Sequence, residues 1–249
     1  MIMKKGLIIG KGWLGNRLEN YLKEDFNLTT TKRNSDTKNC IAVNFDEQTK
    51  TLEQLETFSF IVITIPFGKR NSLEELQQRF QNLSYFISDF KGQIILISST
   101  GIYPNSEKII HENSHKDSEL NDPYIFIENL LKKDFSQLTI LRLGGIMGDD
   151  RYLSKYLNLD RENLDEVVNH IYFVDIINVI KTCIKKSISN KTYNIVAPLH
   201  PTKREVLEYQ INGKIIESET KKGKTISSDK LINELNYQFI HFNPIYFKD

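Results

Sequence analysis

The 249-residue sequence has little cysteine, almost no net charge and no long apolar run. Cys40 and Cys183 are isolated, which excludes a disulfide framework and favours a reducing cytoplasm. Lys and Arg total 33 and Asp and Glu total 32, so a formal charge of +1 recruits neither nucleic acid nor an anionic membrane. No apolar run reaches the roughly 18–20 residues that span a bilayer, and no signal-peptide pattern follows Met1. We therefore expect a cytoplasmic protein without nucleic-acid or membrane partners; its oligomeric state stays open.

The composition that remains is that of a globular chain. Hydrophobic residues make up 39% and charged residues 26%, which excludes disorder, collagen and a coiled coil. The length suits one large α/β domain, alone or with a smaller lid, and is too short for two full independent domains.

Apolar strands alternate with amphipathic helices along the first part of the chain. We expect strands at residues 6–9, 28–31, 41–45, 60–65, 93–98 and 138–142, and helices after Gly15, at 72–90 and at 124–135. In the second helix an apolar stripe runs from Leu73 to Phe90. This alternation predicts right-handed crossovers and an α/β fold, a Rossmann-like doubly wound parallel sheet.

A glycine-rich motif lies between the first strand and the first helix. It reads Gly10-x-Gly12-x-x-Gly15. Gly10 permits the tight turn, Gly12 lets a pyrophosphate approach the backbone, and Gly15 lets helix and strand pack closely. Free N–H groups at the helix start would then hold the phosphates. The alternative is a glycine-rich turn without a ligand.

The end of the second strand bears on which dinucleotide binds. An NAD site usually has Asp or Glu there, whereas this sequence has Lys32 and Arg33, and no carboxylate before Asp36. A guanidinium and an ammonium suit a 2′-phosphate, so we expect NADP(H) in preference to NAD(H). The alternative is that both cations belong to a solvated turn. We also assign further residues of the motif and of strand ends to the coenzyme site: Trp13, Leu14, Asn44, Ile65, Pro66 and Ser98.

Four segments of the chain resemble a known family. They cover residues 10–15, 98–103, 141–148 and 193–198 and so run nearly end to end. The family is the extended short-chain dehydrogenase/reductases of the NAD(P)-dependent epimerase/dehydratase type, and more narrowly an atypical branch of NAD(P)-binding oxidoreductases. The resemblance implies a coenzyme-binding Rossmann domain at 1–145 and a small substrate-binding lid at 146–249, partly interleaved with the sheet.

The resemblance also implies catalytic residues. Ser99 matches the family's Ser or Thr whose hydroxyl hydrogen-bonds the reacting oxygen of the substrate. The alternative is that the hydroxyls of this loop bond only the loop backbone. The family's Tyr-x-x-x-Lys pair, in which the lysine lowers the phenol pKa from about 10, is absent. The helix can be aligned with this pair in two registers. In one, Tyr124 stands at the tyrosine position and Glu128 at the lysine position, where a carboxylate would raise the phenol pKa. In the other, which matches more of the helix, Leu120 stands at the tyrosine position and Tyr124 at the lysine position. We assign Tyr124 as a ribose ligand or weak acid, with Tyr103 as a less favoured substitute.

The substrate side departs from the family as well. The segment Tyr172-Phe173-Val174-Asp175 replaces His-x-Asp-Asp, and the arginine expected upstream is missing, which disfavours a sugar-nucleotide epimerase. Lys69, Arg70 and Arg151 could meet an anionic substrate or could lie in solvated loops. His111-Glu112-Asn113-Ser114-His115 fits the zinc-protease string H-E-x-x-H, but that chemistry needs a helix and the polar flanks disfavour one, so we expect no metal site.

Two functional hypotheses follow. The first is an NAD(P)-dependent oxidoreductase or epimerase/dehydratase-like enzyme acting on a small polar substrate, with an active site that lacks Tyr-x-x-x-Lys. The second is a non-catalytic NADP(H)-binding redox sensor or regulatory protein.

Overall fold

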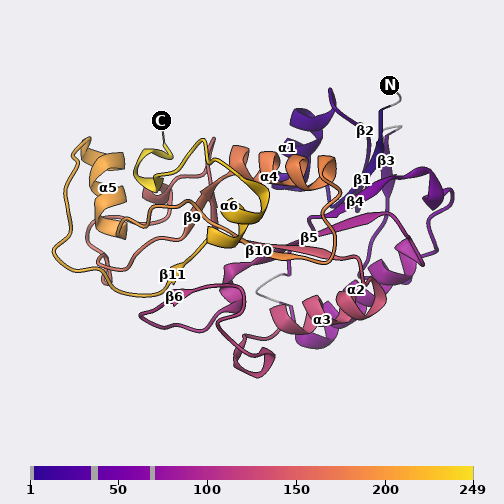
Figure 1. Ribbon diagram of the computed structural model, residues 1–249, viewed down its shortest axis with the longest axis horizontal. Helices are drawn as coiled ribbons and strands as arrows, with labels where there is room; N and C mark the ends of the chain where they lie inside the picture. The colour runs from indigo at the N-terminus through magenta and orange to yellow at the C-terminus, as the bar shows by residue number, and fades with distance from the viewer. Residues whose placement is uncertain (1–2, 35–38, 68–70, 249) are drawn as a thin grey trace. The chain divides into compact units, whose positions relative to one another are not determined.

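A computed structural model describes residues 3–34, 39–67 and 71–248 (Figure 1). Its main sheet has seven strands in the order β10-β7-β5-β4-β1-β2-β3. The strands are parallel, and they confirm the predicted Rossmann-like α/β fold. Their bounds are β1 Lys5–Ile9, β2 Asn27–Lys32, β3 Cys40–Ala42, β4 Phe60–Ile63, β5 Gln93–Ser99, β7 Thr139–Leu143 and β10 Thr192–Ile195.

Among the described helices, the first four lie between strands of this sheet in the sequence, and the last two follow β10. Their bounds are α1 Trp13–Leu22, α2 Leu73–Ile87, α3 Tyr124–Asp134, α4 Phe173–Lys185, α5 Lys203–Asn212 and α6 Asp229–Leu235. Figure 1 shows α2 and α3 together on one face of the sheet and α1 on the other, as a doubly wound sheet requires. Two short parallel pairs complete the strands: β6 Ile109–Ile110 with β11 Thr225–Ile226, and β8 Gly145–Met147 with β9 His170–Tyr172.

The chain forms two compact units, each built from several segments. Unit 1 comprises Met1–Ile102, Leu120–Leu141 and Ile180–Thr192, and unit 2 comprises Tyr103–Glu119, Arg142–Val179 and Tyr193–Asp249. The division into domains at residue 145, with a substrate lid beyond it, stays a prediction.

The core of unit 1 is packed between α2, α3 and the sheet. On α2, Leu76, Phe80, Leu83 and Ile87 are fully buried. Each such side chain contributes about 1.5–3 kcal/mol on leaving water. Leu73, placed in this stripe by the sequence pattern, is instead 38% exposed, because it is the first residue of the helix beside its Ser72 cap.

The helix ends and one strand end have local causes. Ser72 and Glu75 form a capping box at the start of α2, and Thr202 and Glu205 form another at the start of α5. Strand β3 ends at Ala42, three residues earlier than predicted. The Asn44 Oδ1 accepts the backbone N–H of Asp46 at 3.2 Å, and this turn ends the strand.

Unit 2 contains a fully buried carboxylate, Asp175, in the first turn of α4. It accepts hydrogen bonds from the Tyr237 hydroxyl at 2.8 Å and from the backbone N–H groups of Ile240 and His241. These bonds attach the C-terminal segment to α4. Within the described ranges, no helix has both the length and the apolar character that crossing a membrane requires.

Candidate functional site

The glycine motif forms a tight turn between β1 and α1. Gly10 has φ of +104°, a backbone conformation that favours glycine. Its N–H donates to Thr31 Oγ1 at 3.0 Å, and its carbonyl accepts from Thr64 Oγ1 at 2.6 Å. A Cβ atom on Gly15 would lie 2.1 Å from the Gly10 carbonyl oxygen. The turn and the close packing of helix on strand therefore require glycine at positions 10 and 15.

Gly12 is different, because the space beside it is open. Among the described residues, no heavy atom other than those of its chain neighbours lies within 4 Å of a Cβ built on Gly12. The residue is the N-cap of α1, so the first N–H groups of the helix begin at this opening. Such a helix start attracts an anion through its N–H groups and its dipole. The opening is a cradle that fits a phosphate group.

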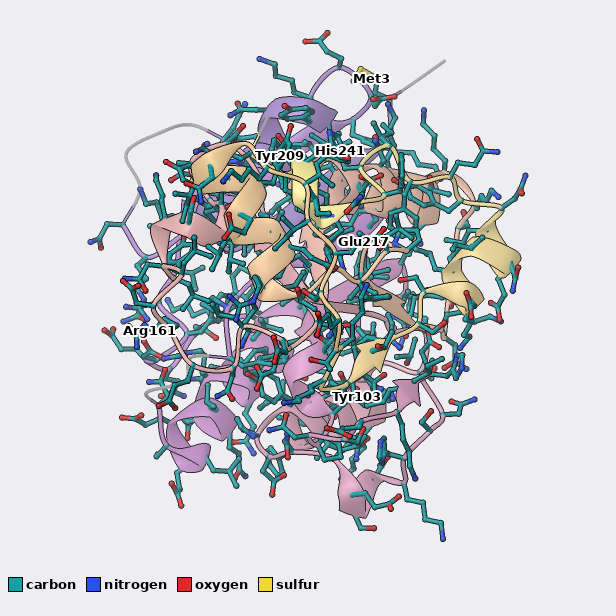
Figure 2. All side chains as sticks on the ribbon, turned by 90° about the vertical axis from the view of Figure 1, so that its left-hand side faces the viewer. Met3, Tyr103, Arg161, Tyr209, Glu217 and His241 are labelled. Carbon is teal, nitrogen blue, oxygen red and sulfur yellow. The ribbon has the colours of Figure 1, made fainter. Side chains whose placement is uncertain are left out.

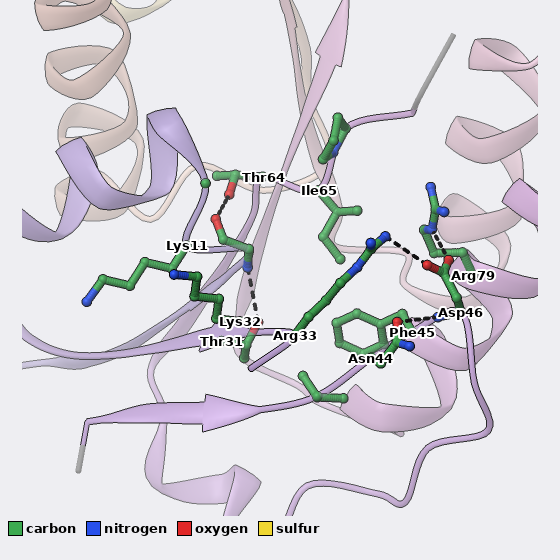
Figure 3. A pocket seen from close by; sticks show the side chains of 14 residues that line it. Lys11, Thr31, Lys32, Arg33, Asn44, Phe45, Asp46, Thr64, Ile65 and Arg79 are labelled. Carbon is green, nitrogen blue, oxygen red and sulfur yellow. Dashed lines mark hydrogen bonds and ion pairs between the residues drawn. The ribbon is translucent and has the colours of Figure 1, made fainter. Parts of the chain in front are cut away.

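A pocket of about 360 Å³ continues from this turn. It is lined by Gly10, Lys11, Gly12, Thr31, Lys32, Arg33, Val43, Asn44, Phe45, Asp46, Thr64, Ile65, Pro66 and Arg79, drawn in Figure 3. Seven residues that the sequence assigned to the coenzyme lie together in it: Gly10, Gly12, Lys32, Arg33, Asn44, Ile65 and Pro66. The apolar side chains among them provide surface for a flat base.

One part of the pocket carries charge. Figure 3 shows the Asp46 carboxylate between two guanidinium groups, with Arg33 NH2 at 2.8 Å and Arg79 Nε at 2.6 Å. The Arg79 side chain is only 9% exposed, whereas that of Arg33 is 67% exposed. Arg79 NH1 also donates to Asn71 Oδ1 at 3.3 Å. The buried arginine thus fixes the carboxylate, which in turn holds the exposed arginine.

Sequence reasoning missed Asp46 and Arg79. Asp46 follows β3 in a turn, and Arg79 lies on the polar side of a helix pattern, so neither belongs to a motif. They are 33 residues apart and meet only through the fold. Thr31 and Thr64, whose hydroxyls bond Gly10, were missed as well, although both stand at strand ends where a ligand site is expected.

Four predicted coenzyme residues lie outside the lining of this pocket. Trp13 carries the Arg17 guanidinium 3.5 Å from its ring centroid, at the start of α1. Leu14 and Gly15 are buried against the sheet. Ser98 is buried, and its Oγ donates to Glu128 Oε1 at 2.7 Å. Their contact with a coenzyme stays a prediction.

The two predicted catalytic residues lie on either side of Gly101. A Cβ on Gly101 would be 3.2 Å from Ser99 Oγ and 3.3 Å from Tyr124 Oη, so the two hydroxyl oxygens are at most the sum of these distances apart. Ser99 Oγ accepts the Gly101 N–H at 3.0 Å. The ring of Tyr124 packs edge-on against Phe67 with centroids 5.5 Å apart. The fold therefore brings both hydroxyls together and gives Ser99 a loop-bonding role as well.

Glu128 lies one turn after Tyr124 in α3 and is fully buried. Its carboxylate accepts the Ser98 hydroxyl, so this acidic side chain is part of the packing between α3 and β5. In the register that pairs Tyr124 with residue 128, a buried carboxylate bonded to Ser98 therefore stands at the lysine position.

Tyr103, labelled in Figure 2, is buried in unit 2. Its hydroxyl donates to Asn194 Oδ1 at 2.7 Å and accepts from Arg142 NH1 at 2.8 Å. Burial raises the phenol pKa of Tyr103, and the Arg142 charge opposes that shift. A buried phenol with both partners in place is a poor proton donor to a substrate.

The zinc-protease string at residues 111–115 is not helical in the structure. Glu112 is buried, and its Oε1 accepts the backbone N–H of Asn194 at 2.8 Å. Over the described part of the chain, no group of three or more His, Cys, Asp or Glu side chains could hold a metal ion. The string therefore lacks the geometry that the motif needs.

A second hollow, of about 600 Å³, lies within unit 2. Its polar lining includes Asn105, Asp165, Glu166, Lys222 and Lys224. Burial lowers the pKa of Lys224, whose Nζ donates to the Tyr103 carbonyl at 2.5 Å.

Of the three candidate anion-binding cations, the structure describes Arg151. Arg151 is held in a backbone bridge with Gly148 and does not line either of these two hollows. Lys69 and Arg70 lie outside the described residues.

Comparisons with known proteins agree with this fold. No family model matches the sequence. Protein YeeZ of Escherichia coli (strain K12) is 23% identical, and the alignment covers 98% of both chains. UDP-N-acetylglucosamine 4-epimerase from Bacillus cereus superposes with a TM-score of 0.71 at 17% identity, over 98% of this chain and 96% of that one. Human epimerase family protein SDR39U1, solved with NADPH, superposes with a TM-score of 0.70 at 12% identity, over 98% and 97% of the two chains.

These structures are of the type that the motifs resemble. The likeness extends over nearly the whole chain, although sequence identity is low. The chain therefore has the fold of the extended short-chain dehydrogenase/reductases and NAD-dependent epimerase/dehydratases.

Proposed function

We propose that this protein binds a nicotinamide dinucleotide, with NADP(H) preferred to NAD(H), and uses it as an oxidoreductase or epimerase/dehydratase-like enzyme. The open space beside Gly12, at the start of α1, carries this proposal. A phosphate fits there only because Cβ is absent and helix N–H groups face the opening. SDR39U1, which shares the fold, was solved with NADPH.

The rest of the pocket suits the adenosine part of the coenzyme. Val43, Phe45 and Ile65 offer apolar surface, and Lys32 and Arg33 lie at the end of β2, where an adenosine ribose is held in this fold. A guanidinium and an ammonium at this place suit a 2′-phosphate, which is the basis of the proposed preference for NADP(H).

A bound nicotinamide coenzyme would supply hydride transfer, which the side chains of the chain cannot perform. The protein's part is to orient the reacting oxygen of a small polar substrate. Ser99 Oγ and Tyr124 Oη, both next to Gly101, offer two hydroxyl donors to that oxygen. They would hold developing negative charge by hydrogen bonds, without a lysine-activated phenol.

A second candidate function is a coenzyme-binding sensor without catalysis. The buried Glu128 favours this function. If Tyr124 is aligned with the family's tyrosine, Glu128 stands at the position of the family's lysine, and its carboxylate bonds Ser98. Such a protein would keep the phosphate cradle and lack an effective proton relay. The two candidates share the binding site and differ in turnover.

The proposal includes a cytoplasmic location. Cys40 and Cys183 are free thiols in the structure, which suits a reducing compartment.

Tryptophan fluorescence tests the binding step directly. The chain has one tryptophan, Trp13, which begins helix α1 beside the cradle. We expect NADPH to quench its emission saturably and NADH to do so more weakly. A screen of carbonyl and sugar substrates then separates the candidates. It follows coenzyme oxidation and also conversion of the substrate itself, because an epimerase or dehydratase regenerates its coenzyme in each turnover. Turnover by either readout supports the enzyme, and saturable binding without turnover on any substrate supports the sensor. Absence of quenching and of coenzyme oxidation with both dinucleotides would contradict both functions.

A further inference from the structure

The charged part of the coenzyme pocket contains a carboxylate that the sequence did not indicate. At the end of β2 no Asp or Glu stands where an NAD site usually has one, yet Asp46 enters the same pocket from the turn after β3. A carboxylate in this place accepts ribose hydroxyls and repels a 2′-phosphate. Asp46 alone would therefore favour NAD(H).

Arg79 changes that balance. Its Nε lies 2.6 Å from Asp46 Oδ1, and its side chain is 9% exposed, so the arginine end of this ion pair is shielded from water, whereas the Asp46 side chain is 35% exposed. The Asn71 amide holds another guanidinium nitrogen at 3.3 Å. A buried arginine fixed at two points cancels most of the field of the carboxylate it contacts.

Arg33 completes the arrangement on the solvent side. It contacts Asp46 through NH2 at 2.8 Å, and its side chain is 67% exposed (Figure 3). A guanidinium has five N–H donors, so the contact with Asp46 leaves donors for bonds to a phosphate. Asp46 thus holds the Arg33 guanidinium over the pocket, while Arg79 cancels the carboxylate's charge.

We propose that the Asp46–Arg79 pair sets the coenzyme preference: Arg79 neutralises Asp46, and Lys32 and Arg33 are left with a net positive charge for a 2′-phosphate. This inference rests on the proposed dinucleotide site and deepens it. Arg79 acts as a specificity-determining residue through Asp46, and the sequence motif for NADP(H) at the end of β2 does not contain it.

The test measures the ratio of dissociation constants for NADPH and NADH in three variants of the full chain. Arg79→Gln removes the buried partner of Asp46 and leaves the carboxylate to the exposed Arg33, whose charge is then no longer available in full to a 2′-phosphate. NADPH binding should therefore weaken about tenfold or more while NADH binding changes little. Asp46→Asn should shift the ratio the other way, toward NADPH. The double variant restores the charge balance of the wild type and should restore its ratio to within a few-fold.

Two further measurements separate electrostatics from folding. Adenosine 2′,5′-bisphosphate and AMP differ only in the 2′-phosphate, and the variants should change their relative affinities in the same direction as those of the dinucleotides. Arg161→Gln is the matched control, because it removes the same charge from an exposed position in unit 2 (Figure 2) and should leave the ratio unchanged. If Arg79→Gln does not fold, the Asp46→Asn variant decides, since the Asp46 side chain is 35% exposed.

The results separate a failure of the proposed dinucleotide binding from a failure of the role given to the Asp46–Arg79 pair. Wild-type protein that binds neither dinucleotide overturns the proposed function and this inference with it. Wild-type protein that binds both, with a ratio that Arg79→Gln leaves unchanged or that Asp46→Asn shifts toward NADH, overturns the inference alone. Opposite shifts in the single variants and recovery in the double variant support it.

Discussion

The carbonyl oxygen of Gly10 occupies the place that a side chain on Gly15 would need. A Cβ atom built on Gly15 lies 2.1 Å from that oxygen, and the Gly10 carbonyl is itself fixed by the Thr64 hydroxyl at 2.6 Å. The backbone oxygen cannot move away without loss of this bond. The third glycine of the motif therefore serves the packing of α1 on β1, whereas the space beside the second, Gly12, is open.

Gly15→Ala should destabilise the fold. The clash with backbone requires α1 to shift from β1, and such overpacking costs about 1–3 kcal/mol or more. For a chain of this size the midpoint of thermal unfolding should fall by roughly 2–4 °C for each kcal/mol. Thermal unfolding followed by circular dichroism measures the change. An unaltered midpoint would show that the helix does not pack as closely as described.

Gly12→Val is the matched contrast at the second glycine. No described heavy atom beyond its chain neighbours lies within 4 Å of the new Cβ, and the residue has φ of −87°, so the thermal midpoint should change little. The added side chain enters the phosphate cradle, so NADPH affinity should fall by about tenfold or more. Calorimetry of this variant checks both parts. Wild-type affinity in Gly12→Val would place the phosphates elsewhere.

Ser99→Ala and Tyr124→Phe should reduce turnover while the coenzyme still binds. Each removes one hydroxyl next to Gly101, and groups that act on the reacting oxygen typically contribute about 10²–10⁴-fold in rate. Steady-state rates together with Trp13 quenching by NADPH separate chemistry from binding. Ser99→Ala also loses the bond from the Gly101 N–H, so Ser99→Thr, which keeps an oxygen, is its control. Full turnover in both hydroxyl deletions would remove these residues from the mechanism.

His170 predicts a pH dependence of stability. Burial, with a smaller effect of the Lys203 charge, lowers the His170 pKa from 6.5 to about 4. The folded state therefore favours the neutral ring, and the unfolded state takes up the proton first as pH falls. The contribution is present above about pH 6.5 and is lost as pH falls toward 4, by up to roughly 3 kcal/mol.

Denaturant unfolding between pH 7 and pH 4 measures this effect. His170→Gln should lose less stability over that range than the wild type. His200, whose pKa burial also lowers, contributes in the same direction and remains in both proteins, so the difference isolates His170. Parallel pH profiles for the two proteins would contradict the assignment.

Sequence patterns located the fold and the tight turn at the glycine motif because both depend on local features. A strand, Gly10-x-Gly12-x-x-Gly15 and a helix follow one another within a short stretch, and each glycine has a steric reason that a sequence displays. The pocket's charge could not be predicted in this way. Asp46 and Arg79 come from separate elements and acquire their roles only when α2 packs beside the turn after β3.

The end of strand β3 and the environments of Ser98 and Ser99 also depend on contacts that form only in the fold. The apolar run at 41–45 predicted a longer strand, and the turn made by Asn44 ends it at Ala42. Ser98 and Ser99 are neighbours with the same side chain, yet one bonds the buried Glu128 and the other lies beside Tyr124 at Gly101. Alternation along a strand separates them, and the partner of each is set by α3, which is distant in sequence.

The central claim is that the turn between β1 and α1 holds the linked phosphates of a nicotinamide dinucleotide. Isothermal titration calorimetry of the intact chain with NADPH tests it most directly. The account predicts saturable heat with one dinucleotide bound per chain, and weaker binding of NADH. Absence of measurable binding for both dinucleotides, in protein shown to be folded, would contradict it.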